Sequence, residues 1–198
     1  GLDPEGVMTV EVLMPEEGSS PAERPQFYQT LLERAEALPG VEAVGLIGRI
    51  PVRDGGWQGS ISLADRPDLV DSQRPSAYFR PVSPGLFDAF DIEVLEGRGI
   101  AETDTRDGRN VAVVNESFAR AMFPGQSAVG RVITRTGFLD GPIEIVGVIR
   151  NVAVDDLMGA VPMAAYYAWA QSFDESAYGI LTLETSLEPG GLVEPLRA

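Results

Sequence analysis

The stretch VAVVNESFARAMFPG, residues 111–125, joins a run of small apolar β-formers to a short helical segment through polar residues. Many enzymes place their chemistry at such a turn. Here, however, Asn115 is a preferred N-cap residue, and the carboxylate of Glu116 suits the positive end of a helix. Phe118 and Met122 are four residues apart and would both face the core. We therefore interpret the stretch as a strand-to-helix joint rather than an active site.

On both sides of this joint the sequence predicts many strands and a few helices, so the predicted fold class is α+β. The helix after Pro25 has apolar residues at helical spacing and ends at Pro39-Gly40, and Ser83-Pro84 is typical of a helix start. Strand, helix and strand over the first fifty residues predict a βαβ unit or half of a ferredoxin-like split unit. Strands are predicted at 7–14, 41–50, 58–64, 77–82, 92–95, 111–114, 131–134, 143–148, 163–170 and 178–185, and helices at 25–38, 84–90, 116–123 and from 192 onward.

The charge balance narrows the classes of partner. The chain has 198 residues, enough for one large domain or two small lobes, and its formal net charge is −15. All basic residues are arginine. Such a chain repels phosphate backbones and anionic lipid head groups, so we expect neither nucleic acid nor a membrane surface as partner.

Cysteine and histidine are missing altogether, and their absence excludes whole classes of chemistry. Without cysteine the chain forms no disulfide and no thiolate metal site, and without histidine it has no Ser-His-Asp triad and no imidazole ligand. No run of about 18 apolar residues predicts a membrane span. Because the sequence opens at Gly1 without a start methionine, we expect it to be a piece of a longer protein.

Two groups of oxygen-bearing side chains are candidates for a catalytic or a metal site. Asp155-Asp156 would suit general acid–base catalysis only within a turn, because neighbouring strand residues point to opposite faces, and a solvated loop is the favoured interpretation. Asp104, Asp107 and Asn110 offer oxygens to Ca²⁺, but their spacing is not that of an EF-hand, so a polar turn is favoured.

Aromatic and glycine residues are candidates for a ligand groove and for a nucleotide-binding loop. Trp57, Tyr166, Tyr167 and Trp169 would be able to line a ligand groove, although most aromatics at such positions are core or half-exposed strand residues. The glycines at 45, 48, 55 and 56 form neither GxGxxG nor a Walker loop. We predict no catalytic residue, no cofactor and no metal site.

Five motifs, in this order, resemble a known family. They are GLDPEGVMTVEV at the start, FYQTLLERAEALPGVEAVGL, YFRPVSPGLFDAFDIEVLEGRGI, VAVVNESFARAMFPGQSAVGRVI and IEIVGVIRNV. Together they cover nearly the whole chain. The sequence resembles the MacB-like periplasmic core domain of ABC transporter permeases, within the FtsX-like permease superfamily, and is most similar to the orphan permeases of acidobacterial type.

The resemblance implies a two-lobed fold. A porter-like βαβ lobe would comprise residues 1–83 and 150–198, and an inserted, small α/β lobe of the sabre type would comprise residues 84–149. In this family the domain lies outside the cytoplasmic membrane, between the first two transmembrane helices of the permease. ATP is hydrolysed elsewhere, and the domain transmits the resulting motion to substrate or partner.

By the same resemblance, the motif residues act as fold determinants only: Asn115, Glu116, Phe118, Phe123, Pro124 and Gly130. The implied partners are the transmembrane part of the same permease, a cytoplasmic ATPase that is fused or separate, and a periplasmic adaptor or substrate. We expect the isolated domain to be monomeric and non-enzymatic, with its two termini close together. The alternatives are a ligand- or lipoprotein-binding module with a groove between the lobes, and a carboxylate-based hydrolase.

Overall fold

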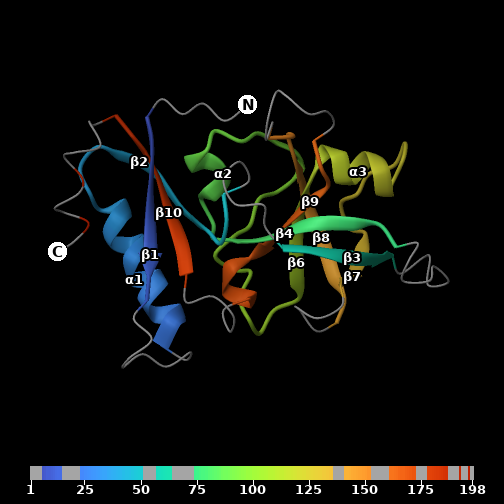
Figure 1. Cartoon of the computed structure of the whole chain (residues 1–198), viewed down its shortest axis with the longest axis horizontal. Helices are drawn as coiled ribbons and strands as arrows, with labels where there is room; N and C mark the ends of the chain where they lie inside the picture. Colours follow the sequence, from blue (N-terminus) through green and yellow to red (C-terminus); the bar gives the residue numbers. More distant parts are fainter. Residues whose placement is uncertain are drawn as a thin grey trace.

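The N- and C-terminal segments come together in one small sheet, seen with its helix on the left of Figure 1. In this computed structural model, β10 (Tyr178–Thr185) lies antiparallel between β1 (Val7–Leu13) and β2 (Val41–Ile47). Helix α1 (Arg24–Glu36) connects β1 to β2, so the split βαβ alternative is confirmed. The structure describes residues 6–14, 23–50, 57–63, 74–135, 141–152, 161–172 and 178–186, together with Leu192 and Leu196.

Six further strands close on themselves, and we call them the strand ring. Strands β3 and β4 pair antiparallel, and β4 also pairs in parallel with β9. From β9 the pairing continues to β6, β8 and β7, and β7 returns to β3. The ring strands are β3 (Trp57–Leu63), β4 (Ser76–Val82), β6 (Asn110–Asn115), β7 (Val132–Arg135), β8 (Ile143–Ile149) and β9 (Ala164–Ala168).

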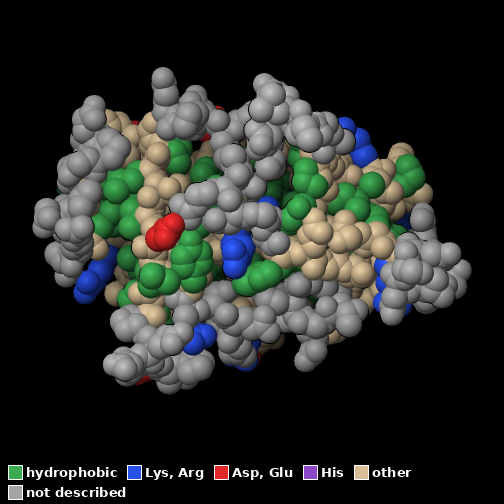
Figure 2. All heavy atoms as spheres, in the orientation of Figure 1, with side chains coloured by type: hydrophobic (Ala, Val, Ile, Leu, Met, Phe, Trp, Pro, Cys, Tyr) green, Lys and Arg blue, Asp and Glu red, His purple; other side chains and the backbone are tan. Residues whose placement is uncertain are grey.

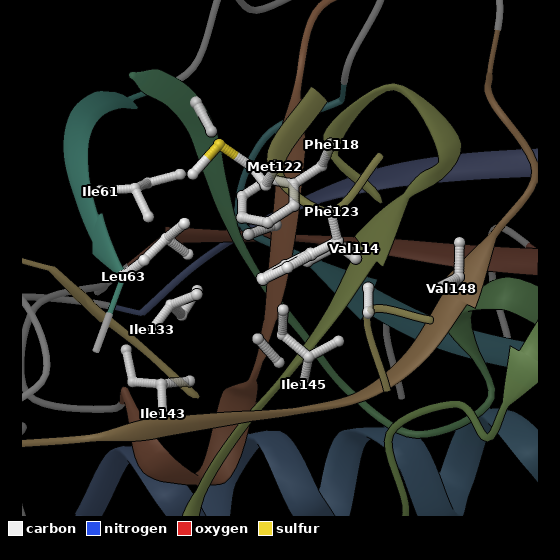
Figure 3. Close-up of a cluster of buried hydrophobic side chains, with 14 of the residues drawn as sticks. Ile61, Leu63, Val114, Phe118, Met122, Phe123, Ile133, Ile143, Ile145 and Val148 are labelled. Carbon is white, nitrogen blue, oxygen red and sulfur yellow. The ribbon is translucent and has the colours of Figure 1, made fainter. Parts of the chain in front are cut away.

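The interior of the strand ring is filled by alternate, inward-facing side chains. In Figure 3, Ile61, Ile133 and Ile145 point toward one another from different strands, and all three are completely buried. Helix α3 (Glu116–Met122) supplies Phe118 and Met122 to the same cluster. The predicted core face of the joint is therefore confirmed, because α3 covers one end of the ring interior.

The sheet and the strand ring meet where β2 lies against β4, at the single ladder pair of Ile47 and Val82. Here the predicted helix start is wrong. Helix α2 (Leu86–Ala89) begins after Gly85, whose φ of +77° suits glycine, and Ser83 does not cap it. The Ser83 hydroxyl instead accepts a hydrogen bond from Leu46 N (2.8 Å) and donates one to Pro84 O (2.8 Å). Because the hydroxyl is engaged at the junction with β2, it does not cap α2.

The remaining differences from the sequence prediction lie at element ends. The predicted strand 41–50 ends at Ile47, because the chain then crosses to β4, where Gly48 N donates to Pro81 O. The strand expected over 163–170 gives way to a 3-10 turn, η3 (Trp169–Gln171), which carries Trp169 onto Tyr28. Among the described strands, β5 (Val94–Gly97) pairs with β8 alone. Most of the helix expected from residue 192 falls outside the described residues.

Candidate functional site

The joint at residues 111–125 is a buried hydrogen-bond centre between three elements. The amide oxygen of Asn115 accepts from Phe118 N and from Ala164 N, each at 3.0 Å, and its Nδ2 donates to Pro162 O at 2.9 Å. The first bond is the predicted N-cap of α3, which is confirmed. The other two fix the start of β9 beside the end of β6. The side chain thus uses both its donor and its acceptor for structure.

Glu116 is held by a residue that the sequence analysis missed. Asn151, just after β8, accepts from Ser117 N through Oδ1 and donates its backbone N–H to Glu116 Oε2, both at 3.0 Å. The backbone hydrogen bond from Asn151, followed by the ion pair with Arg120, holds the pKa of Glu116 below its usual range. A carboxyl group with a lowered pKa stays ionised and is a poor proton donor, so the joint has the chemistry of a helix cap.

The other motif residues lie around the same end of the strand ring. Phe123 ends α3, is 6% exposed, and lies under the guanidinium of Arg131. Pro124 follows it on the surface. Gly130 donates its N–H to Ile145 O (2.8 Å) with a φ of +80°, in open space where a side chain would meet only backbone strain. Their roles as fold determinants stay a prediction.

Asp104, one of the proposed calcium ligands, has an arginine partner. Its two oxygens accept from Arg98 at 2.7 and 2.8 Å, and one of them also accepts from Ala101 N at 2.8 Å. Burial raises the pKa of Asp104, but the hydrogen bonds from Arg98 and Ala101 N outweigh it, so the net pKa is lowered. Among the described residues, no three acidic side chains come together as a metal-ligand group.

Gln171 closes the other end of the strand ring and was also missed. Its Oε1 accepts from Val111 N at 3.0 Å, while its Nε2 donates to Arg109 O at 2.7 Å and to Thr105 O at 3.1 Å. The polar loop before β6 is therefore held by one amide. Local patterns gave no sign of this, because Gln171 contacts residues about sixty positions earlier in the chain.

Three of the four aromatic residues considered for a ligand groove are core residues. Tyr167 stacks on Phe79 inside the ring, with centroids 5.4 Å apart, and Tyr166 meets Phe87 edge to face. Trp169 is 4% exposed and meets Tyr28 in the same way. Trp57 lies under Arg49. No open aromatic surface is therefore offered by Tyr166, Tyr167 and Trp169. They are core residues, as the packing interpretation predicted.

Three surface hollows among the described residues are lined in part by groups that pair with one another. Two adjoining ones, of about 360 and 430 Å³, share the pair of Arg109 and Glu144, and a third of about 420 Å³ adjoins the pair of Arg150 and Glu93. Asp155 and Asp156 lie outside the described residues. Within the part of the chain that is described, no helix has the length and apolar character required to cross a bilayer.

Solved structures with the same architecture come from transporter permeases. The periplasmic region of MacB from Actinobacillus actinomycetemcomitans matches with a TM-score of 0.63 at 14% identity, over 96% of this chain and 80% of that one. The extracellular domain of the noncanonic ABC-type transporter YknZ from Gram-positive bacteria matches with a TM-score of 0.58 at 13% identity, over 95% and 88%. The chain therefore has the fold of the MacB periplasmic region.

The family follows from the sequence itself. The model of the MacB-like periplasmic core domain matches residues 5–197, so the chain belongs to that family and is the periplasmic domain of a MacB-like ABC transporter permease. An uncharacterized ABC transporter permease of Bacillus subtilis, YvrN, is 30% identical over 83 residues. This match covers 42% of the chain and 19% of YvrN.

Proposed function

We propose that this domain is non-catalytic and couples ATP-driven motion of a permease to the handling of a substrate or partner outside the membrane. The observation that carries the proposal is that β1 and β10 are joined at one end of the sheet. Thr185 N donates to Gly6 O at 2.8 Å, and the ladder continues from there without interruption to the pair of Leu13 and Tyr178. A displacement applied to this end would move both strands together.

Three contacts would pass such a displacement from the sheet to the strand ring. Ser83 engages both backbone groups of Leu46, through its own N–H at 3.0 Å and through its hydroxyl at 2.8 Å. On one face of the sheet, Gly45 lies so close to α2 that an added Cβ would be 2.4 Å from Leu86 Cα. On the other face, Trp169 packs on Tyr28.

The two-lobed organisation also belongs to this proposal. The division at 1–83, 84–149 and 150–198 stays a prediction. Strand pairing runs across both of its boundaries, because β3, β4 and β9 belong to the strand ring together with β6, β7 and β8. We propose the β1–β10–β2 sheet with α1 as the porter-like lobe, and the strand ring with α3 as the lobe that contacts substrate or adaptor.

The partners in this scheme are the transmembrane part of the permease, a cytoplasmic ATPase, and a periplasmic adaptor or substrate, while the isolated domain is monomeric. The test uses the full-length permease with its ATPase in lipid nanodiscs, followed by hydrogen–deuterium exchange with and without ATP. We expect ATP to change exchange in the strand ring of the wild type. Replacing Ser83 by Ala and Trp169 by Leu should weaken that response while ATP hydrolysis continues.

Two controls make this test decisive. Glu33→Gln changes an exposed side chain of α1, away from the junction, and should leave the ATP response intact. Melting of the isolated S83A/W169L domain should show that it is folded at the temperature of the experiment. A strand ring whose exchange does not respond to ATP in the wild type, although ATP is hydrolysed, would overturn the coupling proposal.

A further inference from the structure

The sheet has a long outer edge formed by β1. All seven residues of β1 pair with β10 in an unbroken register, and the strand order begins at β1, so no described strand lies on its other side. Edge strands present unpaired N–H and C=O groups to which another chain can add. The strand ring, in contrast, has no such long edge, because its strands close on themselves.

The backbone groups of β1 that face away from β10 can be assigned. In an antiparallel ladder, hydrogen-bonded and non-hydrogen-bonded pairs alternate. Gly6 is hydrogen-bonded to Thr185, so the next hydrogen-bonded positions are 8, 10 and 12. The N–H and C=O groups of Val7, Thr9, Glu11 and Leu13 are therefore directed to the outer edge.

The side chains of β1 form an apolar shelf that α1 covers only in part. Leu181 and Leu183 on β10 are 1% and 0% exposed, whereas Val10 and Val12 beside them on β1 remain half-buried. Leu13, on the opposite face of β1, is 70% exposed. Figure 2 shows hydrophobic side chains around the position of β1 and β10, with an acidic side chain among them.

Most of the devices that protect a free edge are absent from β1. Natural edge strands are shortened, bulged, or interrupted by lysine or proline. The segment from Val7 to Leu13 has no lysine, no proline and no register shift, and its only charged residue is Glu11. A regular, mostly apolar edge of this length is tolerated when a partner covers it.

The surrounding charge indicates the chemistry of that partner. Strands β1, β10 and β2, together with α1 and its N-cap residue, carry two arginines and six glutamates, a net charge of −4. The basic residues are Arg24 and Arg34, and the acidic ones are Glu11, Glu23, Glu33, Glu36, Glu42 and Glu184. The whole chain is also strongly acidic, so a second copy would be repelled, while a cationic segment would be attracted.

We propose that the outer edge of β1 binds an extended, cationic segment of a partner protein, which adds to the sheet as a further strand. Its main chain would pair with the outward groups of Val7, Thr9 and Leu13. Its alternate apolar side chains would extend the shelf of Val10 and Val12. This mode of recognition takes affinity from main-chain hydrogen bonds and specificity from every second side chain.

The probe is a fluorescein-labelled peptide of seven alternating lysine and valine residues, with alternate amides N-methylated so that only one edge can form hydrogen bonds. Binding to the 198-residue chain is followed by fluorescence anisotropy. Thr9→Pro removes an outward N–H without touching the pairing with β10, and proline is tolerated on edge strands. We expect Thr9→Pro to weaken binding at least tenfold, and the matched variant Thr9→Val to change it less than twofold.

A second peptide, methylated at every amide, gives the same test without altering the protein and should not bind, whether or not Thr9→Pro folds. Circular dichroism compares the melting of the variants. The proposal is wrong if the wild type does not bind at millimolar peptide, or if the fully methylated peptide binds as well as the probe. Concentration-dependent dimers of the wild type that Thr9→Pro abolishes would also overturn it, because a second copy would then occupy the edge.

Discussion

The strand ring and the β1–β10–β2 sheet solve the problem of sheet edges in opposite ways. The ring pairs every one of its strands on both sides and fills its interior with fully buried side chains such as Ile133 and Ile145. The sheet leaves β1 with one partner and keeps Val10 half-buried. We therefore expect stability to be concentrated in the ring, and we expect the proposed partner to bind at the sheet.

The largest expected effect on the free energy of unfolding comes from truncating one phenylalanine in each region. Phe118 covers the ring interior and is 0% exposed, while Phe27 on α1 is only partly buried. We expect Phe118→Ala to lower the free energy of unfolding by about 3–5 kcal/mol, and Phe27→Ala by about half of that. Urea unfolding followed by circular dichroism measures both. Equal losses would contradict the concentration of stability in the ring.

The next effect tests the contact between the two regions. At Gly45 an added Cβ would lie 2.4 Å from Leu86 Cα, which is backbone and cannot turn aside. We expect Gly45→Ala to cost about 2–4 kcal/mol, because α2 must move away from the sheet. Gly125→Ala is the control, since nothing lies within 4 Å there and only its φ of +72° opposes a side chain, at a cost of about 1 kcal/mol.

The two asparagines of the joint rank below these. Asn115→Ala removes the cap of α3 and two bonds to the start of β9, so we expect a loss of about 2–3 kcal/mol. Asn151→Ala removes only its side-chain bond to Ser117 N and should cost about 1 kcal/mol. Thermal melting of the two variants should preserve this order, and a reversed order would show that Asn115 is not the centre of the joint.

The smallest effect concerns acid stability. The folded-state pKa of Glu116 is lowered, so the unfolded chain binds its proton first as the pH falls. Its stabilising contribution is therefore complete above the unfolded pKa near 4.5 and is lost as the pH falls through the lower folded value. Glu116→Gln should flatten the pH dependence of the melting temperature below pH 5, and an unchanged dependence would contradict this role of Glu116.

The sequence predicted the parts of the fold that depend on local patterns. The alternation after Val41 and the periodic residues before Pro39-Gly40 predicted β2 and α1, and the N-cap preference of asparagine predicted the role of Asn115. These features succeed because neighbouring residues decide them. The closure of the ring between β4 and β9 was not foreseeable, since parallel pairing of distant strands leaves no short-range pattern.

The same reason explains which residues of the joint were missed. Asn151 follows β8, and because β6 and β8 are parallel, their carboxyl ends meet at the same edge of the sheet. Without the pairing partner of β6, the proximity of Asn151 to Ser117 could not be inferred. For Ser83 the local pattern was misleading. It predicted a helix cap, but the Ser83 hydroxyl accepts a hydrogen bond from the backbone N–H of Leu46, which is distant in the sequence.

The position of β10 has a consequence for the order of folding. Because β10 lies between β1 and β2, neither of those strands pairs with the other, and residue 7 finds its partner only at residue 184. During synthesis, the sheet lacks its central strand until β10, at residues 178–185, has left the ribosome. Contacts of such long sequence separation form slowly. The strand that completes the sheet is thus the last to arrive, and β1 and β2 remain open to wrong pairing until it does.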